Sequence, residues 1–475
     1  MTDRPEHAPA DAETLEKLEQ VLGPGGVREV EPRYLEEPRG RHHGRAGAVL
    51  RPSNAENLAK AVKICSDARV AMVARSGGTG LVGGQVMETG PEPVLISFER
   101  MNTIREVDPR DNIIVAEAGV VLSDVHDAAT DVDRLFPLAL ASQGTACIGG
   151  LLATNAGGVN VLRYGNARDL CLGIECVMAD GTVHHGLGGL VKDNMGYDLR
   201  HLMIGSEGTL GLITAAVLRL HPVPRETVTG WIAVGSPDEA LELLNLMRGS
   251  LGGSISAFEL IHRQGLDFLR EKMPDVPIPP DFDSEWLVLT EAADGQGAMV
   301  EERFMATLEA AFEEGAASDG LIAQSGTQRE AFWNVRESIP EANRLVGAVA
   351  SHDVSLKASR IAEFIGKARS LLEDLNPDLR LNCFGHLGDG NLHFNIYGPK
   401  GANRKDYDRY REPATQLVHE TVHEFGGSVS AEHGVGRLKV ADLERYGDPA
   451  KLKAMRALKQ ALDPLGILNP GAVLA

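Results

Sequence analysis

The chain has 475 residues, of which 43% are hydrophobic and 24% are charged, as in an ordinary globular protein. Because one hydrophobic core rarely serves a chain of this length, we expect two or three compact units. The formal charge of −20, with no long run of Lys or Arg, argues against a nucleic-acid-binding role, since polyphosphate would be repelled.

The first twenty residues, MTDRPEHAPADAETLEKLEQ, have neither the basic and apolar regions of a signal peptide nor the Arg-rich character of a transit peptide. No apolar run approaches the length of a membrane span. The five cysteines are scattered, odd in number and without a CxxC pair, which predicts reduced thiols. Cys171 and Cys176 are close enough in sequence to share a metal, but burial in a core is the commoner use. We therefore expect a cytoplasmic protein with no membrane span.

Helical and strand patterns divide the chain into four parts. Residues 12–22 show the amphipathic pattern of a helix, and a polar, irregular stretch follows them. Short apolar runs then alternate with glycine turns and with helices such as 54–68, where Asn54 is a good N-cap. Later the glycine density falls, and strands alternate with longer helices such as 301–314. We predict an α+β protein with an N-terminal helix and irregular segment (1–47), a glycine-rich domain (48–224), a second α+β domain (225–429) and a C-terminal helical segment (430–475).

Three glycine-rich segments stand out in the glycine-rich domain. RSGGTGLVGG (75–84) follows a predicted strand and can bring backbone N–H groups against a pyrophosphate with no Cβ in the way. Its spacing is not that of a Rossmann or Walker A loop, so a simple tight turn is an equal alternative. SQGTACIGGLLATNAGG (142–158) adds Ser, Thr and Asn donors. IGSEGTLGLIT (204–214) places Glu207 before a strand, with a bulged edge strand as the alternative.

Two segments carry histidines in a pattern that is typical of a metal-binding or catalytic site. In GHLGDGNLHFN the glycines predict a turn followed by a strand, so His393 and Asn395 project to one face and Phe394 to the other. SAEHGVG contains Glu432 next to a further histidine. Two imidazoles and a carboxylate, from His386, His393 and Glu432, are ligands that suit Zn²⁺ or a related ion. Taken singly, each histidine is more typical of a satisfied strand residue than of a metal ligand.

These motifs together resemble a known family. PSNAENLAKAV, RSGGTGLVGG, TNAGGVNVLRYG, KDNMGYDLRHLMIGSEGTLGLIT, GHLGDGNLHFN and SAEHGVGRLK occur in the order found in the FAD-dependent D-2-hydroxyacid dehydrogenases of the vanillyl-alcohol-oxidase type. The sequences of these motifs are most similar to those of D-2-hydroxyglutarate dehydrogenases. The resemblance covers nearly the whole chain beyond residue 48. It implies a PCMH-type FAD-binding domain, an α+β substrate (cap) domain and a C-terminal helical segment that returns to the flavin.

The resemblance also implies which residues bind the flavin. Some relatives attach it covalently through a histidine in the first loop, where this chain has Ser76 and Thr79, so we expect non-covalent FAD. The expected FAD-binding residues are Arg75, Ser76, Gly77, Gly78, Thr79, Gly80, Leu81, Pro137, Ser142, Gly144, Thr145, Gly149, Asn155, Gly158, Glu207, Gly208 and Ile213.

The resemblance assigns His386, His393 and Glu432 to a divalent metal, expected to be Zn²⁺, with Mn²⁺ and Fe²⁺ as alternatives. A 2-hydroxy acid would chelate this ion, which lowers the pKa of the substrate hydroxyl. Histidine, with an unperturbed pKa of ~6.5, can accept a hydroxyl proton near neutral pH, and His433 is the candidate base that takes this proton while the C2 hydride passes to flavin N5. A surface histidine beside a turn is the alternative for that residue.

Substrate recognition is expected at Arg336, Asn395, His433 and Lys357. Arg336 matches an arginine that relatives use on a substrate carboxylate, a contact that suits a guanidinium, although a surface charge beside Glu337 is the alternative. Where 2-hydroxyglutarate enzymes carry a lysine thought to help bind the distal carboxylate, this chain has Ser351, and Lys357 replaces a proline further on. D-2-Hydroxyglutarate is therefore the first expectation, and D-lactate or another D-2-hydroxy acid is the alternative.

A non-catalytic FAD-binding subunit is the alternative from a different class, but such a subunit need not keep the two metal histidines, the metal glutamate and the base together. An enzyme of this family also needs an external electron acceptor. The resemblance allows an electron-transfer flavoprotein, a cytochrome or a quinone, and it allows a homodimer.

Overall fold

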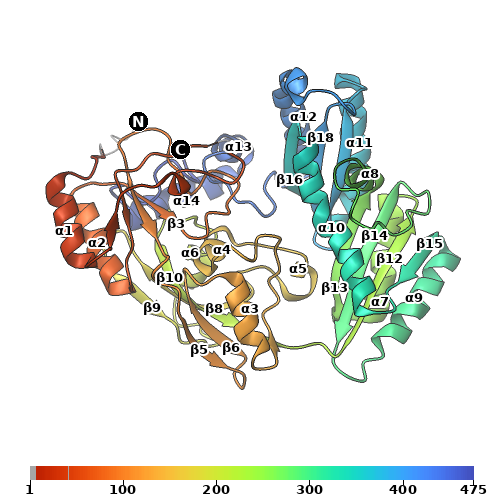
Figure 1. The fold of residues 1–475 in the computed structure, drawn as a ribbon, viewed down its shortest axis with the longest axis horizontal. Helices are drawn as coiled ribbons and strands as arrows, with labels where there is room; N and C mark the ends of the chain where they lie inside the picture. Colours follow the sequence, from red (N-terminus) through yellow and green to blue (C-terminus); the bar gives the residue numbers. More distant parts are fainter. Residues whose placement is uncertain (1–6, 41) are drawn as a thin grey trace. The chain divides into compact units, whose positions relative to one another are not determined.

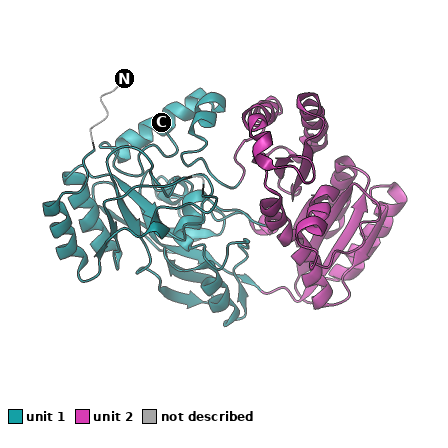
Figure 2. Cartoon of the chain, turned by 45° about the horizontal axis from the view of Figure 1, so that its top comes forward, with its two compact units in different colours: residues 1–158, 165–222, 432–475 teal, residues 159–164, 223–431 magenta. Residues whose placement is uncertain are grey.

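The structure is a computed structural model that describes residues 7–40 and 42–475. The chain forms two compact units (Figure 2): unit 1 comprises residues 1–158, 165–222 and 432–475, and unit 2 comprises residues 159–164 and 223–431. The sequence places domain limits after residues 224 and 429, close to the unit limits after 222 and 431. It does not anticipate that residues 159–164 join unit 2. Part of the expected N-terminal segment, residues 1–6 and 41, lies outside the described residues.

Unit 1 contains two main sheets. The first has the strand order β1-β2-β4-β3, in which β2, β4 and β3 are parallel, and the second is antiparallel with the order β5-β6-β10-β8-β9. A short pair, β11-β7, completes the set. The strands are β1 (Val27–Arg28), β2 (Ala48–Leu50), β3 (Met72–Arg75), β4 (Val94–Ser97), β5 (Ile104–Asp108), β6 (Ile113–Glu117), β7 (Arg134–Leu135), β8 (Cys171–Val177), β9 (Val183–Gly186), β10 (Leu212–Arg219) and β11 (His221–Pro222).

The helices of unit 1 follow from local signals in the sequence. Helices α1 and α2 pack together (Figure 1) and share a core with the first sheet through Leu18, Leu58 and Met72. Asp11 and Asn54 cap them, so both predicted helices are confirmed. The helices are α1 (Ala12–Leu22), η1 (Pro32–Tyr34), α2 (Ala55–Asp67), α3 (Leu122–Thr130), α4 (Ile148–Thr154), α6 (Leu199–Met203), α13 (Val440–Tyr446) and α14 (Pro449–Leu462).

The C-terminal segment packs in unit 1. Leu468 forms a parallel bridge with Met72 of β3, and Ile467 and Leu468 are buried in the core of the first sheet. The strand after Glu207 is β10, the middle strand of the second sheet, with a register shift between Ile213 and Ala215. The alternative of an edge strand at this place is therefore wrong.

Unit 2 is built on one seven-stranded sheet with the order β15-β12-β14-β13-β17-β18-β16, in which all neighbours are antiparallel. Alternate side chains of its strands enter two cores. One core includes Phe304, Phe364 and Val418 from α9, α11 and α12, and the other includes Leu266 and Val335 from α8 and α10. The side chains of Glu259 and His393 lie on the face that carries the core of Leu266 and Val335.

The strands of unit 2 are β12 (Glu226–Val234), β13 (Ile255–His262), β14 (Trp286–Asp294), β15 (Asp319–Ile322), β16 (Ala350–Ser355), β17 (Arg380–His386) and β18 (Asn391–Tyr397). Its helices are α5 (Val161–Tyr164), α7 (Pro237–Leu251), η2 (Gly252–Ser254), α8 (Arg263–Lys272), α9 (Val300–Glu314), α10 (Gly326–Val346), η3 (Ala358–Arg360), α11 (Ile361–Leu375), η4 (Arg404–Tyr410) and α12 (Arg411–Glu424). The expected helix at 301–314 is thus confirmed as α9.

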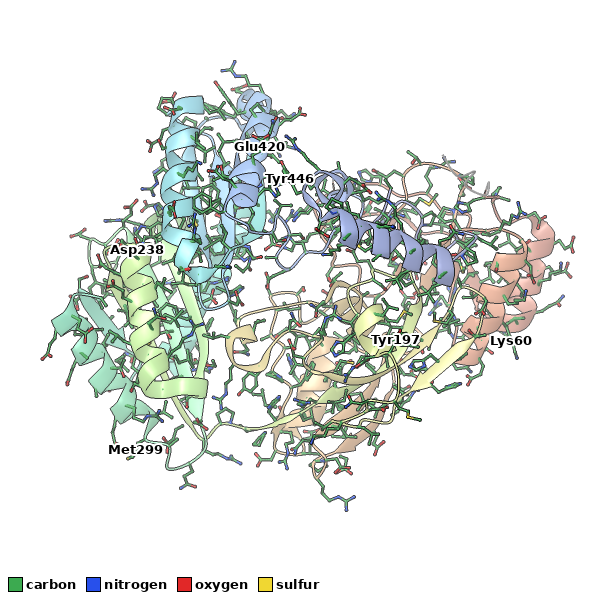
Figure 3. The ribbon with its side chains drawn as sticks, turned by 180° about the vertical axis from the view of Figure 1, so that it is seen from behind. Lys60, Tyr197, Asp238, Met299, Glu420 and Tyr446 are labelled. Carbon is green, nitrogen blue, oxygen red and sulfur yellow. The ribbon has the colours of Figure 1, made fainter. Side chains whose placement is uncertain are left out.

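The loop between β9 and α6 exposes the apolar side chains of Val191, Met195 and Tyr197, and Figure 3 labels Tyr197 on the outside of unit 1. Within residues 7–40 and 42–475, none of the helices has the length and apolar character needed to cross a bilayer. The five cysteines are free thiols, and Cys171 and Cys176 are buried in β8.

Candidate flavin loops and metal centre

The first glycine-rich loop follows β3 and packs against the second. A Cβ on Gly77 would lie 2.2 Å from the backbone oxygen of Thr145, so only glycine allows the two loops to approach this closely. Gly78 has φ +70°, a conformation that favours glycine. In the described part of the chain, the half-buried backbone N–H groups of residues 77–81 donate to no other protein group. Such a row of available donors fits the pyrophosphate of FAD.

Several of the expected FAD-binding side chains instead hold the loops in place. The guanidinium of Arg75 donates to the backbone oxygens of Arg33 and Glu36, at 2.6 and 3.1 Å, and Ser76 Oγ donates to Ala118 O at 3.1 Å. Asn155 ends α4 with φ +53°, and its Oδ1 accepts the N–H of Arg168. These side chains therefore shape the loops, and their contacts with the flavin stay a prediction.

The remaining expected flavin residues differ in exposure. Gly149 packs against Ala118, where a Cβ would lie 2.7 Å from the alanine Cβ, and Gly158 has φ +138° with no room for a Cβ beside Ala139 O. Thr79, Gly80, Leu81 and Ser142 are half-buried, Gly144 and Thr145 are exposed, and Pro137, Gly149, Gly158, Gly208 and Ile213 are buried. Ile213 is a core residue of β10.

Glu207 has a different role from the one expected of its side chain. Its two carboxylate oxygens accept the backbone N–H groups of Val435 and Gly436, at 2.7 and 2.8 Å. Burial raises the pKa of Glu207, and the two N–H donors and the charge of Arg437 oppose that rise. Asn469 donates to the backbone oxygen of Glu207 at 2.9 Å. The carboxylate thus holds the segment that follows His433.

Arg437 links the segment after His433 to the first glycine-rich loop. Its guanidinium donates to the backbone oxygens of Gly83 and Gly84 in the first loop, at 3.0 and 3.1 Å, and to Asn469 Oδ1 at 2.8 Å. Burial lowers its pKa to about 10. The sequence reading missed Arg437, although it lies inside the quoted motif SAEHGVGRLK.

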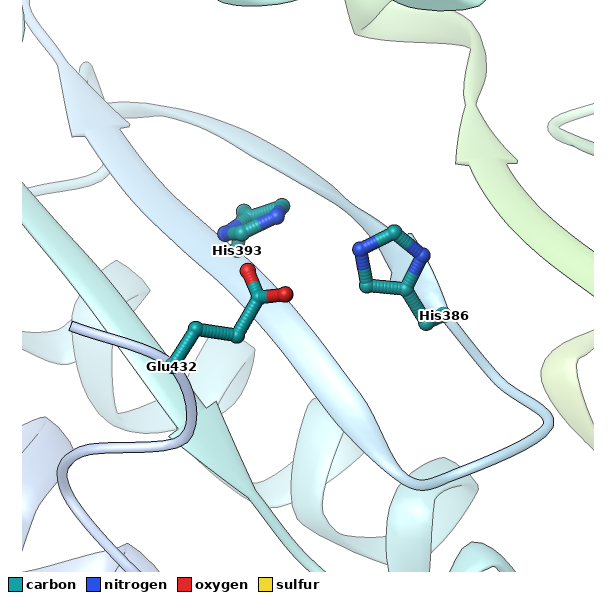
Figure 4. Close-up of side chains that lie close together, drawn as sticks. All are labelled: His386, His393 and Glu432. Carbon is teal, nitrogen blue, oxygen red and sulfur yellow. The ribbon is translucent and has the colours of Figure 1, made fainter. Parts of the chain in front are cut away.

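The expected metal ligands come together in space. β17 ends at His386, a turn follows, and β18 brings His393 back alongside, because Phe384 pairs with His393 across the two strands. Glu432 follows Ala431, whose N–H donates to Asp353 O of β16 at 3.3 Å. One ligand atom from each of His386, His393 and Glu432 lies within 4.8 Å of the other two (Figure 4). The structure therefore provides the donor set that a divalent metal requires.

A buried carboxylate supports this cluster. Glu259 of β13 is fully buried, and its Oε1 lies 2.5 Å from His386 Nδ1, while its Oε2 accepts Arg336 Nε at 2.7 Å. The sequence reading missed Glu259, and the only local signal was a single acidic residue in the apolar run SAFELI. Arg336 is buried, so the alternative of a surface charge beside Glu337 is wrong.

The remaining expected substrate residues lie at different places. Asn395 is buried, and its Oδ1 accepts the N–H of His352 at 3.3 Å. Ser351 pairs with Asn395 and is exposed. Lys357 is exposed beyond the end of β16. His433 is half-buried beside Glu432, and Gly434 has φ +80°, which gives the bend expected there.

Comparison with known proteins identifies the family of the chain. Residues 46–186 match the family model for the FAD binding domain, and residues 223–473 match that for FAD linked oxidases, C-terminal domain. A D-2-hydroxyglutarate dehydrogenase of Xanthomonas citri pv. viticola is 36% identical over 424 residues, covering 89% of this chain and 88% of that protein. A mitochondrial D-2-hydroxyglutarate dehydrogenase of Arabidopsis thaliana is 34% identical over 438 residues, covering 91% of this chain and 76% of that protein.

The fold agrees as well. A structure of p-cresol methylhydroxylase with substrate bound superposes with a TM-score of 0.76 at 17% identity, covering 97% of this chain and 96% of that one, which confirms the expected PCMH-type architecture. With identities above 30% over most of the chain, this protein belongs to the FAD-linked oxidases and, among them, to the family of FAD-dependent D-2-hydroxyacid dehydrogenases.

Proposed function

We propose that the protein oxidises D-2-hydroxyglutarate to the corresponding 2-oxo acid, with non-covalently bound FAD and a divalent metal, Zn²⁺ as first choice. The observation that carries the proposal is the convergence of His386, His393 and Glu432. The names of the two relatives support the substrate. The metal would polarise the substrate hydroxyl, and the flavin would accept the hydride.

The residues of the chain have separate roles in this proposal. Arg336 binds a substrate carboxylate through its terminal nitrogens, because its Nε is already bonded to Glu259. His433 accepts the hydroxyl proton, because an imidazole beside the substrate can serve as a general base. Asn395 adds a polar group on the face of His393. The electron acceptor is a second protein or small molecule, and both a homodimer and a cytoplasmic location stay predictions.

One observation favours a second substrate within the same class. Position 351 carries a small neutral side chain where the family pattern has a lysine for the distal carboxylate. Without that cation, a monocarboxylic substrate such as D-lactate loses less binding energy relative to the dicarboxylate. D-Lactate is therefore the second candidate.

The test is flavin reduction in a single turnover. The FAD-loaded, metal-loaded protein is mixed anaerobically with D-2-hydroxyglutarate, D-lactate or the L-enantiomer of either, and flavin bleaching is followed. We expect bleaching with a D-2-hydroxy acid only, and a loss of bleaching after chelation that metal restores. We expect His433→Gln to slow bleaching by about 10² to 10⁴-fold with unchanged FAD and metal content, since general bases contribute that much.

His423→Gln, an exposed histidine on α12, serves as the matched control and should bleach at the wild-type rate. Bleaching of His433→Gln at the wild-type rate would show that the base is another group. Bleaching that survives complete metal removal would show that the metal centre does not take part.

A further inference from the structure

Glu259 joins the two groups that the proposed function uses most. It lies on β13 directly opposite His386 of β17, so both side chains point to the same face of the sheet. One carboxylate oxygen contacts His386 Nδ1 at 2.5 Å, and the other accepts Arg336 Nε at 2.7 Å. No part of Glu259 reaches solvent. A single carboxylate therefore connects an expected metal ligand to the expected substrate arginine.

The contact with His386 determines which nitrogen faces the metal. Nδ1 of His386 lies 2.5 Å from a carboxylate oxygen of Glu259. A carboxylate oxygen accepts hydrogen bonds, so in this arrangement Nδ1 is the nitrogen that donates. Nε2 then keeps its lone pair for a metal ion. A carboxylate behind a ligating histidine commonly fixes its ring in this way.

The contact with Arg336 orients the guanidinium. Arg336 comes from α10, its Nε is bonded to Glu259, and its Cζ lies 5.2 Å from the ring centre of Phe384. Only 6% of the residue is exposed, so the side chain has little freedom to turn. Within residues 7–40 and 42–475, the terminal nitrogens of Arg336 have no hydrogen-bond partner, which leaves them for a carboxylate.

We propose that Glu259 is a positioning residue that holds His386 and Arg336 in one fixed arrangement, so that metal binding and substrate-carboxylate binding both depend on it. This inference rests on the metal centre and the role of Arg336 in the proposed function. In this proposal Glu259 acts through its contacts with His386 and Arg336. Its removal should weaken both kinds of binding together.

Glu291 provides a matched control on the neighbouring strand. It lies on β14, on the same face of the sheet, and is also a buried carboxylate bonded to α10. Arg329 donates to it at 2.7 and 2.8 Å, and Trp333 Nε1 donates at 2.9 Å. Among the described residues, the hydrogen-bond partners of its carboxylate are Thr229, Arg329 and Trp333, none of which is an expected metal ligand. Loss of Glu291 therefore reports the structural cost of removing such a carboxylate and nothing more.

The experiment compares Glu259→Gln, Glu291→Gln, His386→Ala and the wild type as FAD-loaded proteins stripped of metal. The dissociation constant for Zn²⁺ is measured by competition with a chromophoric chelator, and the visible absorption of Co²⁺-loaded protein reports the ligand environment. We expect Glu259→Gln to bind Zn²⁺ at least about 10-fold more weakly, with altered Co²⁺ bands and a raised KM. Glu291→Gln should lower the melting temperature and keep the wild-type affinity within about twofold.

Arg336→Met separates the two halves of the proposal. It should raise KM and leave Zn²⁺ affinity within about twofold of wild type, since Glu259 still holds His386. If Glu259→Gln does not fold because Arg336 is left unpaired, Glu259→Gln/Arg336→Met removes the buried charge and should show the same loss of metal affinity. Wild-type metal affinity and Co²⁺ spectra in a Glu259 variant, or an equal loss in Glu291→Gln, would overturn the role of Glu259. Undiminished Zn²⁺ binding by His386→Ala would overturn the metal centre itself.

Discussion

At the scale of single residues, Ser351 and Lys357 bear on substrate choice. In the register of β16 and β18, Ser351 pairs with Asn395 and Asp353 pairs with His393, so position 351 lies close to the expected metal ligand. Lys357 lies six residues further on, up to about 20 Å away along an extended chain. A role of Lys357 in binding the distal carboxylate stays a prediction.

We predict that Ser351→Lys increases the preference for D-2-hydroxyglutarate over D-lactate. A lysine at this position would form a charge-assisted hydrogen bond with the distal carboxylate, which gives a gain of about tenfold or more in the ratio of kcat/KM values. Steady-state rates with both substrates provide the measurement. Ser359→Lys, an exposed serine in η3, is the control and should leave the ratio unchanged. An unchanged ratio in Ser351→Lys would show that the distal carboxylate binds elsewhere.

At the scale of elements, Glu207 connects the loop before β10 to the segment after His433. Its carboxylate is the acceptor for two backbone N–H groups that belong to no helix or strand. Since buried N–H groups need partners, the position of this segment depends on the one side chain.

We predict that Glu207→Ala lowers the free energy of unfolding by about 2 to 4 kcal/mol, because two N–H groups lose their acceptor. Glu207→Gln keeps one amide oxygen and should cost less, about 1 to 2 kcal/mol. Urea titration of the FAD-loaded protein measures both values. Glu92→Ala, which breaks only the exposed pair with Arg45, is the control and should cost less than about 1 kcal/mol. If Glu207→Ala costs no more than this control, the carboxylate is not needed to hold the segment.

Many elements could be predicted from the sequence, and particular residues show why. Asn54 caps α2, and the apolar repeat in 301–314 forms α9, since both signals act within a few residues. The predicted alternation of side chains along β18 is also confirmed, because Phe394 and Ile396 enter one core and His393 faces the other side. The strand order could not be predicted in the same way, because β13 and β17 pair across more than a hundred residues and no local pattern encodes that choice.

At the scale of the whole molecule, the two units provide separate reporters. All three tryptophans, Trp231, Trp286 and Trp333, belong to unit 2, and the match to the FAD binding domain lies in unit 1 apart from residues 159–164. Tryptophan fluorescence therefore follows the unfolding of unit 2, and calorimetry follows both units.

We predict that FAD stabilises unit 1 more than unit 2. At a free concentration of 100 times Kd, a ligand adds about 2.7 kcal/mol to the free energy of unfolding, which raises the melting temperature of a unit of this size by about 5 to 10 °C. FAD-stripped protein is melted with and without FAD, by calorimetry and by tryptophan fluorescence. The transition of unit 1, which calorimetry records and tryptophan fluorescence does not, should show the larger increase in melting temperature on addition of FAD. Equal shifts by both methods would mean that the two units unfold as one.

Short motifs in the sequence were enough to predict the family, a flavin part followed by a substrate part, and the expected metal ligands. The distant residues that support these ligands became known only from the fold. Glu259 lies 127 residues before His386, and Glu207 lies 228 residues before Val435. Spacing along the chain encodes local backbone conformation, whereas contacts at such separations depend on the order in which strands pair and loops pack.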